Sequence, residues 1–576
     1  MDSRAEGFCM KGCHTIFFYW GPAFFFFSIE VRLGPPTELR GAEGGTHVRA
    51  VIPRSRRDRM GSLCFYRDPI RLLRSLGMTE TALRMTRGGK CPQLSETNRT
   101  SHAIPPSATF GMPPTRHSPT QPHRMSLMQV AVSAIEKKVH VISLGCPRNR
   151  VDSEVMLGSL MIKGWAHIDT PEDADVIVVN TCGFIQSAKE ESIDTILRCA
   201  AYKEQNPDMR LVVTGCLTQR YKTRLVQGLP EVDLFIGTDE FSRIAELLEN
   251  PPAKEKLFAK RTHYLYNEEL PRINTLTPHS AYVKIAEGCQ HNCAFCSIPA
   301  IRGRLRSRPI ANVVSEVQGL VANGVKEVIL IAQDLAAYGR DHSRDDLLPL
   351  LKALEDIEGL QWLRLLYMYP ENISEDFLDF FAASKKLVPY LDIPVQHASN
   401  TILASMKRCV DRETLTHILK RVRTRLPALA LRTTVMVGFP GETEADFEEL
   451  LEFIQEMEFD HLGCFAYSQE EGTVAARMED QIDEDVKKDR LHRLMELQQD
   501  ISHKVLQRRY TEQRCAVMLE KWDPTSKTWQ GRLSTQAPQI DGIIDVRGAP
   551  VDATVGSLGH VQITGCSTYD LQGEWV

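Results

Sequence analysis

The sequence lacks any apolar run long enough to cross a membrane. A spanning helix needs roughly 18 consecutive apolar residues, and no stretch of this 576-residue chain reaches that length. Residues 16–29 come closest, but they include Gly21 and Pro22, and no small-residue cleavage pattern follows them. The sequence therefore predicts neither a membrane anchor nor a signal peptide, and no membrane partner is expected.

The main body of the chain also lacks an excess of basic residues. The net charge is −5, but residues 1–124 hold 18 Lys and Arg against 9 Asp and Glu, so residues 125–576 carry −14. Contacts to nucleic-acid phosphates need a basic surface. An acidic body therefore argues against a nucleic-acid partner and favours a basic macromolecule.

The fifteen cysteines are an odd number, and eleven of them lie after residue 124. In a long chain without a secretory signal, this usage is typical of reduced thiols that serve metal or redox chemistry. We therefore expect a cytoplasmic protein without a disulfide scaffold. The chain length allows about two to four domains.

Residues 1–124 are rich in Arg, Pro, Ser and Gly and show no sustained period of 2 or 3.6 residues. Met125 and Met128 offer a second start just before the periodic sequence begins. We therefore interpret residues 1–137 as a leader, either disordered or the product of an over-long start. A transit peptide is the alternative, and the nine acidic residues argue against it.

Residues 138–250 contain three predicted strands, and each strand ends close to a cysteine. The apolar runs 139–144, 174–180 and 211–214 are each followed by helical sequence, which is typical of a parallel α/β sheet. The carboxyl ends of parallel strands line one edge of a sheet. Taken singly, each of the three cysteines could be a buried structural thiol. Because all three follow strands of one sheet, we expect them to meet in space and bind metal; they are Cys146, Cys182 and Cys216.

A second α/β run follows residues 251–278, a polar segment with prolines that we interpret as a linker. Residues 279–508 repeat strand–helix units, which predict a partial or full β/α barrel that ends in an amphipathic helix over 485–508. Residues 509–576 favour a small β-barrel. The predicted fold class is thus α/β, with an open parallel amino-terminal domain, a central β/α barrel and a small carboxy-terminal β-barrel.

The strongest chemical signal is the loop EGCQHNCAFC, which directly follows the first strand of the barrel. Its C-x3-C-x2-C spacing differs from the ferredoxin run, but three thiolates suit three irons of a [4Fe–4S] cluster and leave the fourth iron open. The predicted ligands are Cys289, Cys293 and Cys296. Zinc is the alternative, although its fourth ligand would be His291, which lies inside the loop with poor geometry for the same ion.

This loop resembles that of the radical SAM superfamily, including the aromatic Phe295 before its last cysteine. The surroundings of the other three cysteines resemble the amino-terminal domain of methylthiotransferases, in the segments SLGCPRNRVDSE, NTCGFIQSAKEES and TGCLTQRY. With DIPVQHAS, VGFPGETEADFEELLEFI and further motifs, the resemblance covers about residues 138–574. It implies that the carboxy-terminal barrel is a TRAM domain.

The same resemblance implies two [4Fe–4S] clusters, one on each cysteine triad, and S-adenosylmethionine (SAM) at the open iron of the loop cluster. One electron would cleave SAM to a radical that takes a substrate hydrogen, while the amino-terminal cluster takes part in sulfur delivery. An electron donor of the flavodoxin or ferredoxin type is an implied partner. No acid–base dyad or nucleophilic side chain is expected as a catalytic group.

Within the family, the motifs are most similar to the branch that modifies the twelfth protein of the small ribosomal subunit. This resemblance implies a methylthio group added to the β-carbon of an aspartate. Residues 510–576 hold eight acidic and five basic residues, which suits a Lys/Arg-rich ribosomal protein better than transfer RNA. A transfer-RNA methylthiotransferase acting on a modified adenosine, an iron–sulfur carrier without activity and a zinc protein are the alternatives.

Several other residues carry weaker expectations. The segment 438–443, GFPGET, lacks the Lys of a P-loop and is interpreted as a tight strand-to-helix turn near SAM. The basic run 302–308 is either a nucleic-acid contact or a solvated or interface patch. Four polar side chains are expected at strand ends, where they either touch SAM or substrate or form a structural polar network: Gln333, Asp334, Gln396 and His397. Buried structural thiols are expected at Cys199, Cys409, Cys464, Cys515 and Cys566.

Overall fold

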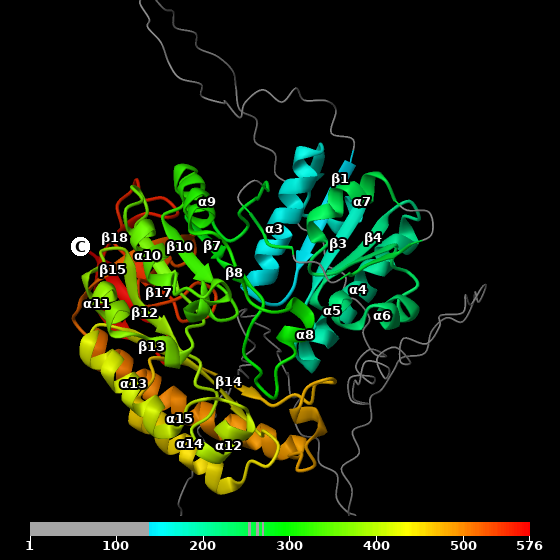
Figure 1. The fold of residues 1–576 in the computed structure, drawn as a ribbon. Coiled ribbons are helices and arrows are strands. Elements are labelled where there is room, and N and C mark those ends of the chain that lie inside the picture. The colour runs from blue at the N-terminus through cyan, green and yellow to red at the C-terminus, as the bar shows by residue number, and fades with distance from the viewer. Residues whose placement is uncertain (1–136, 252–254, 261–263, 268–269) are drawn as a thin grey trace, which may run out of the picture.

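The computed structural model describes residues 137–251, 255–260, 264–267 and 270–576. The expected leader lies outside these residues except for Lys137, which begins the first strand. Three units follow one another along the chain and pack together (Figure 1). They are an open parallel sheet with helices, a larger α/β unit with an open parallel sheet, and a small closed barrel.

The amino-terminal unit is a six-stranded parallel sheet in the order β2-β1-β3-β4-β5-β6. Its central strand is buried on both faces because helices cover each side. Ile177 and Val179 pack towards α4 (Gln186–Gln205), while Val176 and Val178 pack towards α3 (Pro147–Ile162). The strands are β1 (Lys137–Ser143), β2 (Trp165–His167), β3 (Val176–Thr181), β4 (Arg210–Gly215), β5 (Leu234–Ile236) and β6 (Leu257–Phe258).

The segment expected to be a linker contributes β6, which pairs with β5 and completes the sheet. Phe258 and Tyr266 from this segment are buried in the core beneath α3. The shorter helices of the unit are α5 (Cys216–Tyr221), α6 (Thr223–Gly228) and α7 (Ile244–Glu249). Residues 251–278 therefore belong partly to the amino-terminal core, because a few apolar side chains were enough to extend the sheet.

The central unit is a parallel sheet in the order β14-β13-β12-β11-β10-β7, open between its two edge strands. It is thus a partial barrel. Its strands are β7 (Ser280–Lys284), β10 (Glu327–Ile331), β11 (Trp362–Leu365), β12 (Leu387–Asp392), β13 (Ala430–Val437) and β14 (His461–Ala466). Its helices are α8 (Ile298–Arg302), α9 (Ile310–Ala322), α10 (Leu347–Glu355), α11 (Glu375–Ala383), α12 (Asn400–Ser405), α13 (Arg412–Arg425), α14 (Glu444–Met457) and α15 (Glu484–Tyr510).

Alternation along the strands of this sheet separates two cores. Val328 and Leu330 of β10 belong to the core that the outer helices cover, whereas Ile329 and Ile331 belong to a second core on the opposite face. That second core includes Met518 of the small barrel. The central sheet therefore needs the carboxy-terminal unit to cover apolar surface that it does not cover itself.

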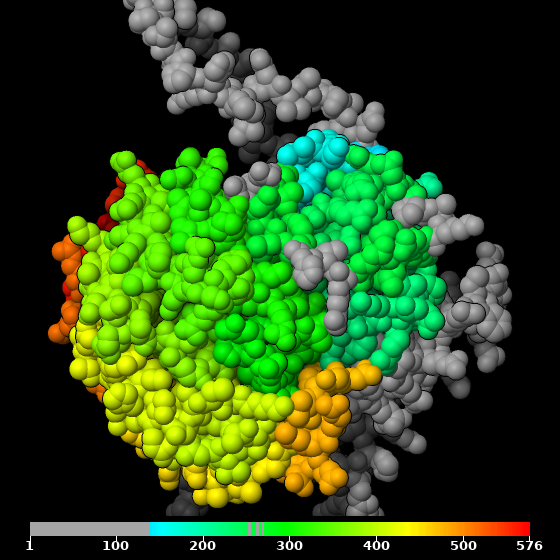
Figure 2. Space-filling model, viewed as in Figure 1, coloured from blue at the N-terminus to red at the C-terminus, as the bar shows by residue number. Residues whose placement is uncertain are grey.

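The carboxy-terminal unit is a closed five-stranded barrel in the order β15-β16-β17-β19-β18, as the sequence predicted. Closure satisfies the strand edges that an open sheet would expose. Figure 2 shows the amino-terminal unit in direct contact with the central unit. The strands are β15 (Arg514–Asp523), β16 (Thr528–Leu533), β17 (Ile544–Arg547), β18 (Leu558–Cys566) and β19 (Leu571–Trp575).

Candidate functional site

The first three predicted cysteines lie at the carboxyl ends of three neighbouring strands, β1, β3 and β4. Cys146 is the N-cap of α3, Cys182 directly follows β3, and Cys216 is the first residue of α5. The loops approach closely at Gly145, where an added Cβ would lie 3.1 Å from the Cys182 Sγ, and where φ is +84°. Only glycine suits that position, so the Gly-Cys sequence is part of what brings these loops together.

Asn149 ties the loops of this amino-terminal triad to one another. Its buried amide Nδ2 donates to the carbonyl oxygens of Leu144 at 3.0 Å and Thr181 at 2.9 Å. Its Oδ1 accepts from the Cys216 thiol at 3.5 Å, and Asn180 donates to its backbone carbonyl at 2.8 Å. Because one side chain contacts the backbone or thiol of all three strand ends, it holds their relative positions.

The second triad lies on the loop between β8 (Ala286–Glu287) and α8. All three thiols are half-buried. The Cys289 amide donates to the Gly303 carbonyl at 3.2 Å, the Cys296 amide donates to the Cys293 carbonyl at 3.1 Å, and the Ile298 amide donates to the Cys296 Sγ at 3.4 Å. These bonds give the loop a defined shape, with three thiols at the carboxyl end of the central sheet.

His291, the fourth ligand of the zinc alternative, has other partners. Its Nε2 lies 2.7 Å from the Asp334 carboxylate, and its ring stacks on Tyr369 with the centroids 3.9 Å apart. Within the described ranges, no three His, Cys, Asp or Glu side chains are grouped as ligands of a single metal ion. A cubane cluster does not require such a group, because each thiolate binds a different iron. The donor set of three thiols per triad fits a [4Fe–4S] cluster.

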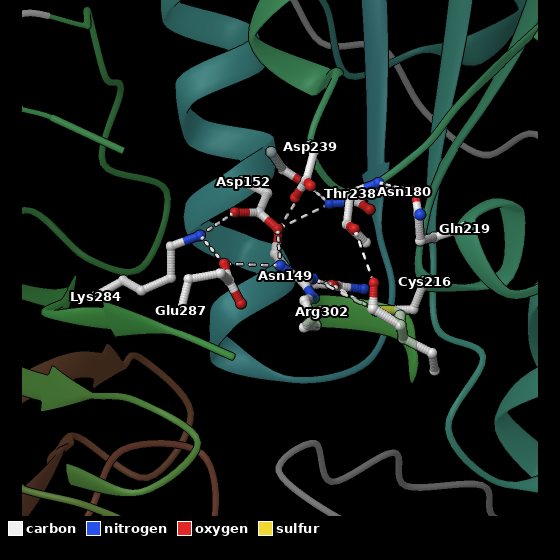
Figure 3. Close-up of polar contacts among 12 residues, drawn as sticks. Asn149, Asp152, Asn180, Cys216, Gln219, Thr238, Asp239, Lys284, Glu287 and Arg302 are labelled. Atoms are coloured by element: carbon white, nitrogen blue, oxygen red, sulfur yellow. Dashed lines mark hydrogen bonds and ion pairs between the residues drawn. The ribbon is translucent and has the colours of Figure 1, made fainter. Parts of the chain in front are cut away.

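A buried polar network extends from Cys216 of the amino-terminal triad to Glu287, which lies beside the second triad (Figure 3). Arg302 of α8 donates to Asp152 of α3 at 2.7 Å, to Glu287 at 3.1 Å, and to Asn149 at 2.5 Å. The same guanidinium reaches the Cys216 Sγ at 3.4 Å. Because Glu287 lies two residues before Cys289, this arginine connects both cysteine loops across the domain boundary.

Lys284 completes the network from β7. Its ammonium donates to Asp152 at 2.6 Å and to Glu287 at 2.7 Å, so two cations and two carboxylates balance one another in a buried site. Gln333 donates to the second oxygen of Glu287 at 2.7 Å. Such a network tolerates burial because each charge has a partner of opposite sign.

Family models match the three units in order. Residues 138–237 match the family described as Uncharacterized protein family UPF0004, residues 283–454 match the radical SAM superfamily, and residues 513–576 match the TRAM domain. The chain is 46% identical over 453 residues to the ribosomal protein uS12 methylthiotransferase RimO of Bdellovibrio bacteriovorus, covering 77% of this chain and 98% of that protein.

The chain belongs to the RimO family. The RimO proteins of Desulfitobacterium hafniense and Geobacter sulfurreducens are 42% and 44% identical to it, over 77% of this chain and 100% and 99% of theirs. The resemblance to methylthiotransferases is thereby confirmed, and the chain is a radical SAM methylthiotransferase, a transferase. Its radical SAM domain implies a [4Fe–4S] cluster, SAM and a source of electrons.

Among the helices of the described ranges, none has the length and apolar composition that crossing a bilayer requires.

Burial and neighbouring charges act in opposite directions on the thiols of this RimO-family site. At Cys146, burial opposes ionisation, but the guanidiniums of Arg148 and Arg302 outweigh it and lower the pKa of the thiol. Burial raises the pKa of Cys289 to about 11 and that of Cys296 to about 12. Thiolates are the form that binds iron, so loading a cluster releases the protons of these thiols.

The polar strand-end residues lie at the mouth of the central sheet, and most of them have structural partners. Besides its bond to His291, the Asp334 side chain accepts from the Ala336 amide at 3.0 Å. His397 is fully buried and accepts from the Ser399 amide at 3.0 Å. Gln396 has a left-handed φ of +73° and bridges to Val435 of β13.

Two motifs found in the sequence have a structural explanation. Residues 438–443 form the turn between β13 and α14, where Thr443 and Asp446 make a reciprocal capping box. Arg302 and Arg308 of the basic run are buried and paired with carboxylates, and Arg308 lies 2.6 Å from Glu316. The basic run therefore serves in part as a domain interface.

The expectation for the other cysteines was partly wrong. Cys199 and Cys464 are buried, but Cys409 is exposed, and Cys515 and Cys566 are half-buried. Cys409 lies in the short connection after α12, where its side chain is not turned to the core. A cysteine without a motif gives no sequence signal for its orientation.

Sequence reasoning also missed the residues that support the triads. Asn149, Asp152, Lys284 and Arg302 were not singled out as site residues, although each lies within a few residues of a predicted ligand or, for Lys284, at the end of the strand before the loop. A charged residue in an otherwise apolar buried strand, such as Lys284 in SAYVK, is a signal that could have found one of them.

Proposed function

We propose that this RimO-family enzyme adds a methylthio group to the β-carbon of an aspartate in ribosomal protein uS12. The proposal is supported by the full-length similarity to proteins named uS12 methylthiotransferases. The observation that carries it is the pair of thiol triads on two neighbouring units, with buried contacts from Arg302 to Glu287 beside one triad and to Cys216 of the other. That arrangement suits two linked sites acting on one substrate carbon.

Two [4Fe–4S] clusters are part of the proposal. Cys289, Cys293 and Cys296 would hold one, and Cys146, Cys182 and Cys216 would hold the other. When bound, the clusters and SAM supply the radical and the sulfur that an unactivated carbon requires. The chain itself holds both loops in place through Asn149 and Arg302, and both of these side chains are buried.

We further propose that electrons come from a small donor protein of the flavodoxin or ferredoxin type, and that the enzyme acts in the cytoplasm, where ribosomal proteins are made. The acidic body of the chain suits the basic surface of a ribosomal protein. Transfer RNA is the second candidate substrate, and the similarity to uS12 enzymes favours the protein substrate over it.

The deciding experiment is mass spectrometry of uS12 from cells with and without this gene. We expect a methylthio mass increment on one aspartate only when the gene is present. If uS12 is unmodified in both strains, while a methylthio-adenosine in transfer RNA depends on the gene, the substrate assignment is wrong.

Cysteine variants test the division between the two triads. Cys293→Ala should abolish SAM cleavage by the anaerobic, reduced enzyme, because the radical SAM loop loses a ligand. Cys182→Ala should retain SAM cleavage but lose transfer of the methylthio group. Equal loss of SAM cleavage in both variants would show that the two sites do not work separately.

Purified protein also distinguishes the remaining alternatives. Iron and acid-labile sulfide are expected in amounts that correspond to two clusters per chain. A colourless protein with zinc and no sulfide would establish a zinc site. A protein that holds clusters but fails to cleave SAM when reduced would be an iron–sulfur carrier.

A further inference from the structure

Arg148 extends from the amino-terminal unit into the mouth of the central sheet. It is the second residue of α3, and its Nη1 donates to the carbonyl oxygen of Ala332 at 2.6 Å. Its guanidinium carbon lies 4.6 Å from the centroid of the Tyr367 ring. Ala332 directly follows β10, and Tyr367 follows β11. The guanidinium therefore lies over the carboxyl ends of the central strands, where substrates of such folds bind.

The same guanidinium lies where the loops of the two triads approach one another. Arg148 follows Cys146 by two residues, at the start of α3. Its partner Ala332 precedes Gln333, whose side chain donates to Glu287 at 2.7 Å, two residues before Cys289. Arg148 therefore links the amino-terminal cysteine loop to the strand ends beside the second triad.

Arg148 lacks the counter-ion that other arginines of this interface have. Arg302 pairs with Asp152 and Glu287, and Arg272 pairs with Glu154 at 2.7 Å. Within the described part of the chain, no carboxylate forms an ion pair with Arg148, and its Nε and Nη2 make no hydrogen bond. One edge of a fixed, half-buried guanidinium is thus left for an anion.

The aromatic ring beneath the guanidinium is held in a strained conformation. Tyr367 has a left-handed φ of +65°, and its amide donates to the carboxylate of Asp392 at 3.1 Å. A non-glycine residue in this region persists only where its surroundings hold it, and such residues gather at ligand sites. Tyr367 and Ala332 together fix the direction in which Arg148 presents its free edge.

We propose that Arg148 binds the side-chain carboxylate of the substrate aspartate and so places the β-carbon between the two triads. This inference rests on the proposed function. The substrate carbon is the group that both sites must reach, and Arg148 joins the unit that carries one triad to the strand ends beside the other. In an aspartate the carboxylate is bonded to the β-carbon, so fixing one fixes the other. A guanidinium suits the task because its planar edge binds both carboxylate oxygens.

The test measures binding, not turnover. The anaerobic, iron-loaded full chain is titrated with fluorescently labelled uS12 that carries either its target aspartate or asparagine at that position. Wild-type enzyme should bind the aspartate form at least about tenfold more tightly. Arg148→Met should abolish this preference and leave the affinity for the asparagine form unchanged. Arg148→Lys should retain part of the preference, because lysine keeps the charge but not the planar edge.

Arg150 is the matched control on the same helix. It bonds to Thr275 at 3.2 Å and to Gln539 at 3.3 Å, away from the mouth, so Arg150→Met should keep the full preference. Both forms of uS12 are compared on one preparation, so a partly damaged variant weakens both binding constants equally and keeps their ratio.

Four results would overturn the proposal. Arg148→Met with an unchanged preference would show that another group binds the carboxylate. A weaker affinity for SAM with the preference retained would assign Arg148 to the SAM carboxylate instead. Wild-type enzyme that does not bind uS12 at all would remove the substrate assignment itself, whereas wild-type binding without an aspartate preference would remove only the role of Arg148.

Discussion

Replacing Arg302 with methionine is the sharpest test of the buried network. The substitution keeps a long apolar side chain but removes the guanidinium that joins α3 to the central unit. Asp152 and Glu287 would then share only Lys284, although all three side chains remain buried. The Cys216 Sγ would lose a donor at 3.4 Å. The expected consequence is a weaker contact between the two units and a looser amino-terminal triad.

The size of the effect follows from what the guanidinium contacts. A hydrogen bond to a charged group contributes about 1.5–3 kcal/mol, and Arg302 bonds to two carboxylates at 2.7 and 3.1 Å. Removing one partner of a buried ion pair typically costs about 3–5 kcal/mol, because the other charge is left uncompensated. We expect a loss in that range. Arg302→Lys should lose less stability, since lysine keeps the positive charge but not the planar guanidinium with its several donors.

Hydrogen exchange of the α3 amides in iron-free protein measures this loss directly. A cost of about 3–5 kcal/mol corresponds to about two to four orders of magnitude in the exchange rate of a helix that opens with the interface. Arg198→Met is the control, because Arg198 is 68% exposed and pairs with Asp194 on the surface of α4. Its effect should stay below about 1 kcal/mol. Equal exchange in the two variants would refute the reasoning.

Three further predictions concern the loops and the unit boundary. Gly145→Ala should lower the iron content of the amino-terminal site, because the new Cβ would lie 2.7 Å from the Cys182 Cβ. The measurement is made in a Cys293→Ala background, so that the iron counted is that of the amino-terminal site. A normal iron content there would contradict the close approach. Asn149→Ala should have the same selective effect on iron retention, since its amide ties the loops; loss of iron from the loop site as well would mean general unfolding. At Glu327, burial opposes ionisation, but Arg532 outweighs it and lowers the pKa from 4.5 to about 2. Its stabilising contribution is therefore complete above about pH 4.5 and is lost as the pH falls towards 2. Glu327→Gln should lower the free energy of unfolding by about 3–5 kcal/mol at neutral pH. It should also reduce the fall of that free energy at acid pH, measured by following unfolding with tryptophan fluorescence. An unchanged fall at acid pH would exclude Glu327 as its origin.

The sequence alone determined the fold class and the order of the three units. Apolar runs of strand length, each followed by helical sequence, are local signals, and the structure has strands β1, β3 and β4 where three of these runs were found. The same topology predicted that cysteines after those strands would share one edge, because carboxyl ends of parallel strands always do. The loop spacing C-x3-C-x2-C is likewise a local property.

Tertiary structure decided which side chains support the two triads. Arg302 lies 86 residues from Cys216 and 150 residues from Asp152, and Arg148 lies 184 residues from Ala332, so no local pattern pairs them. It also decided that the central sheet stays open and that part of the expected linker joins the first sheet. A buried charge is stable only beside a partner of opposite sign, and here that partner comes from another unit of the chain. The chemistry could therefore be predicted from motifs, whereas the residues that hold it in place could be seen only in the packed molecule.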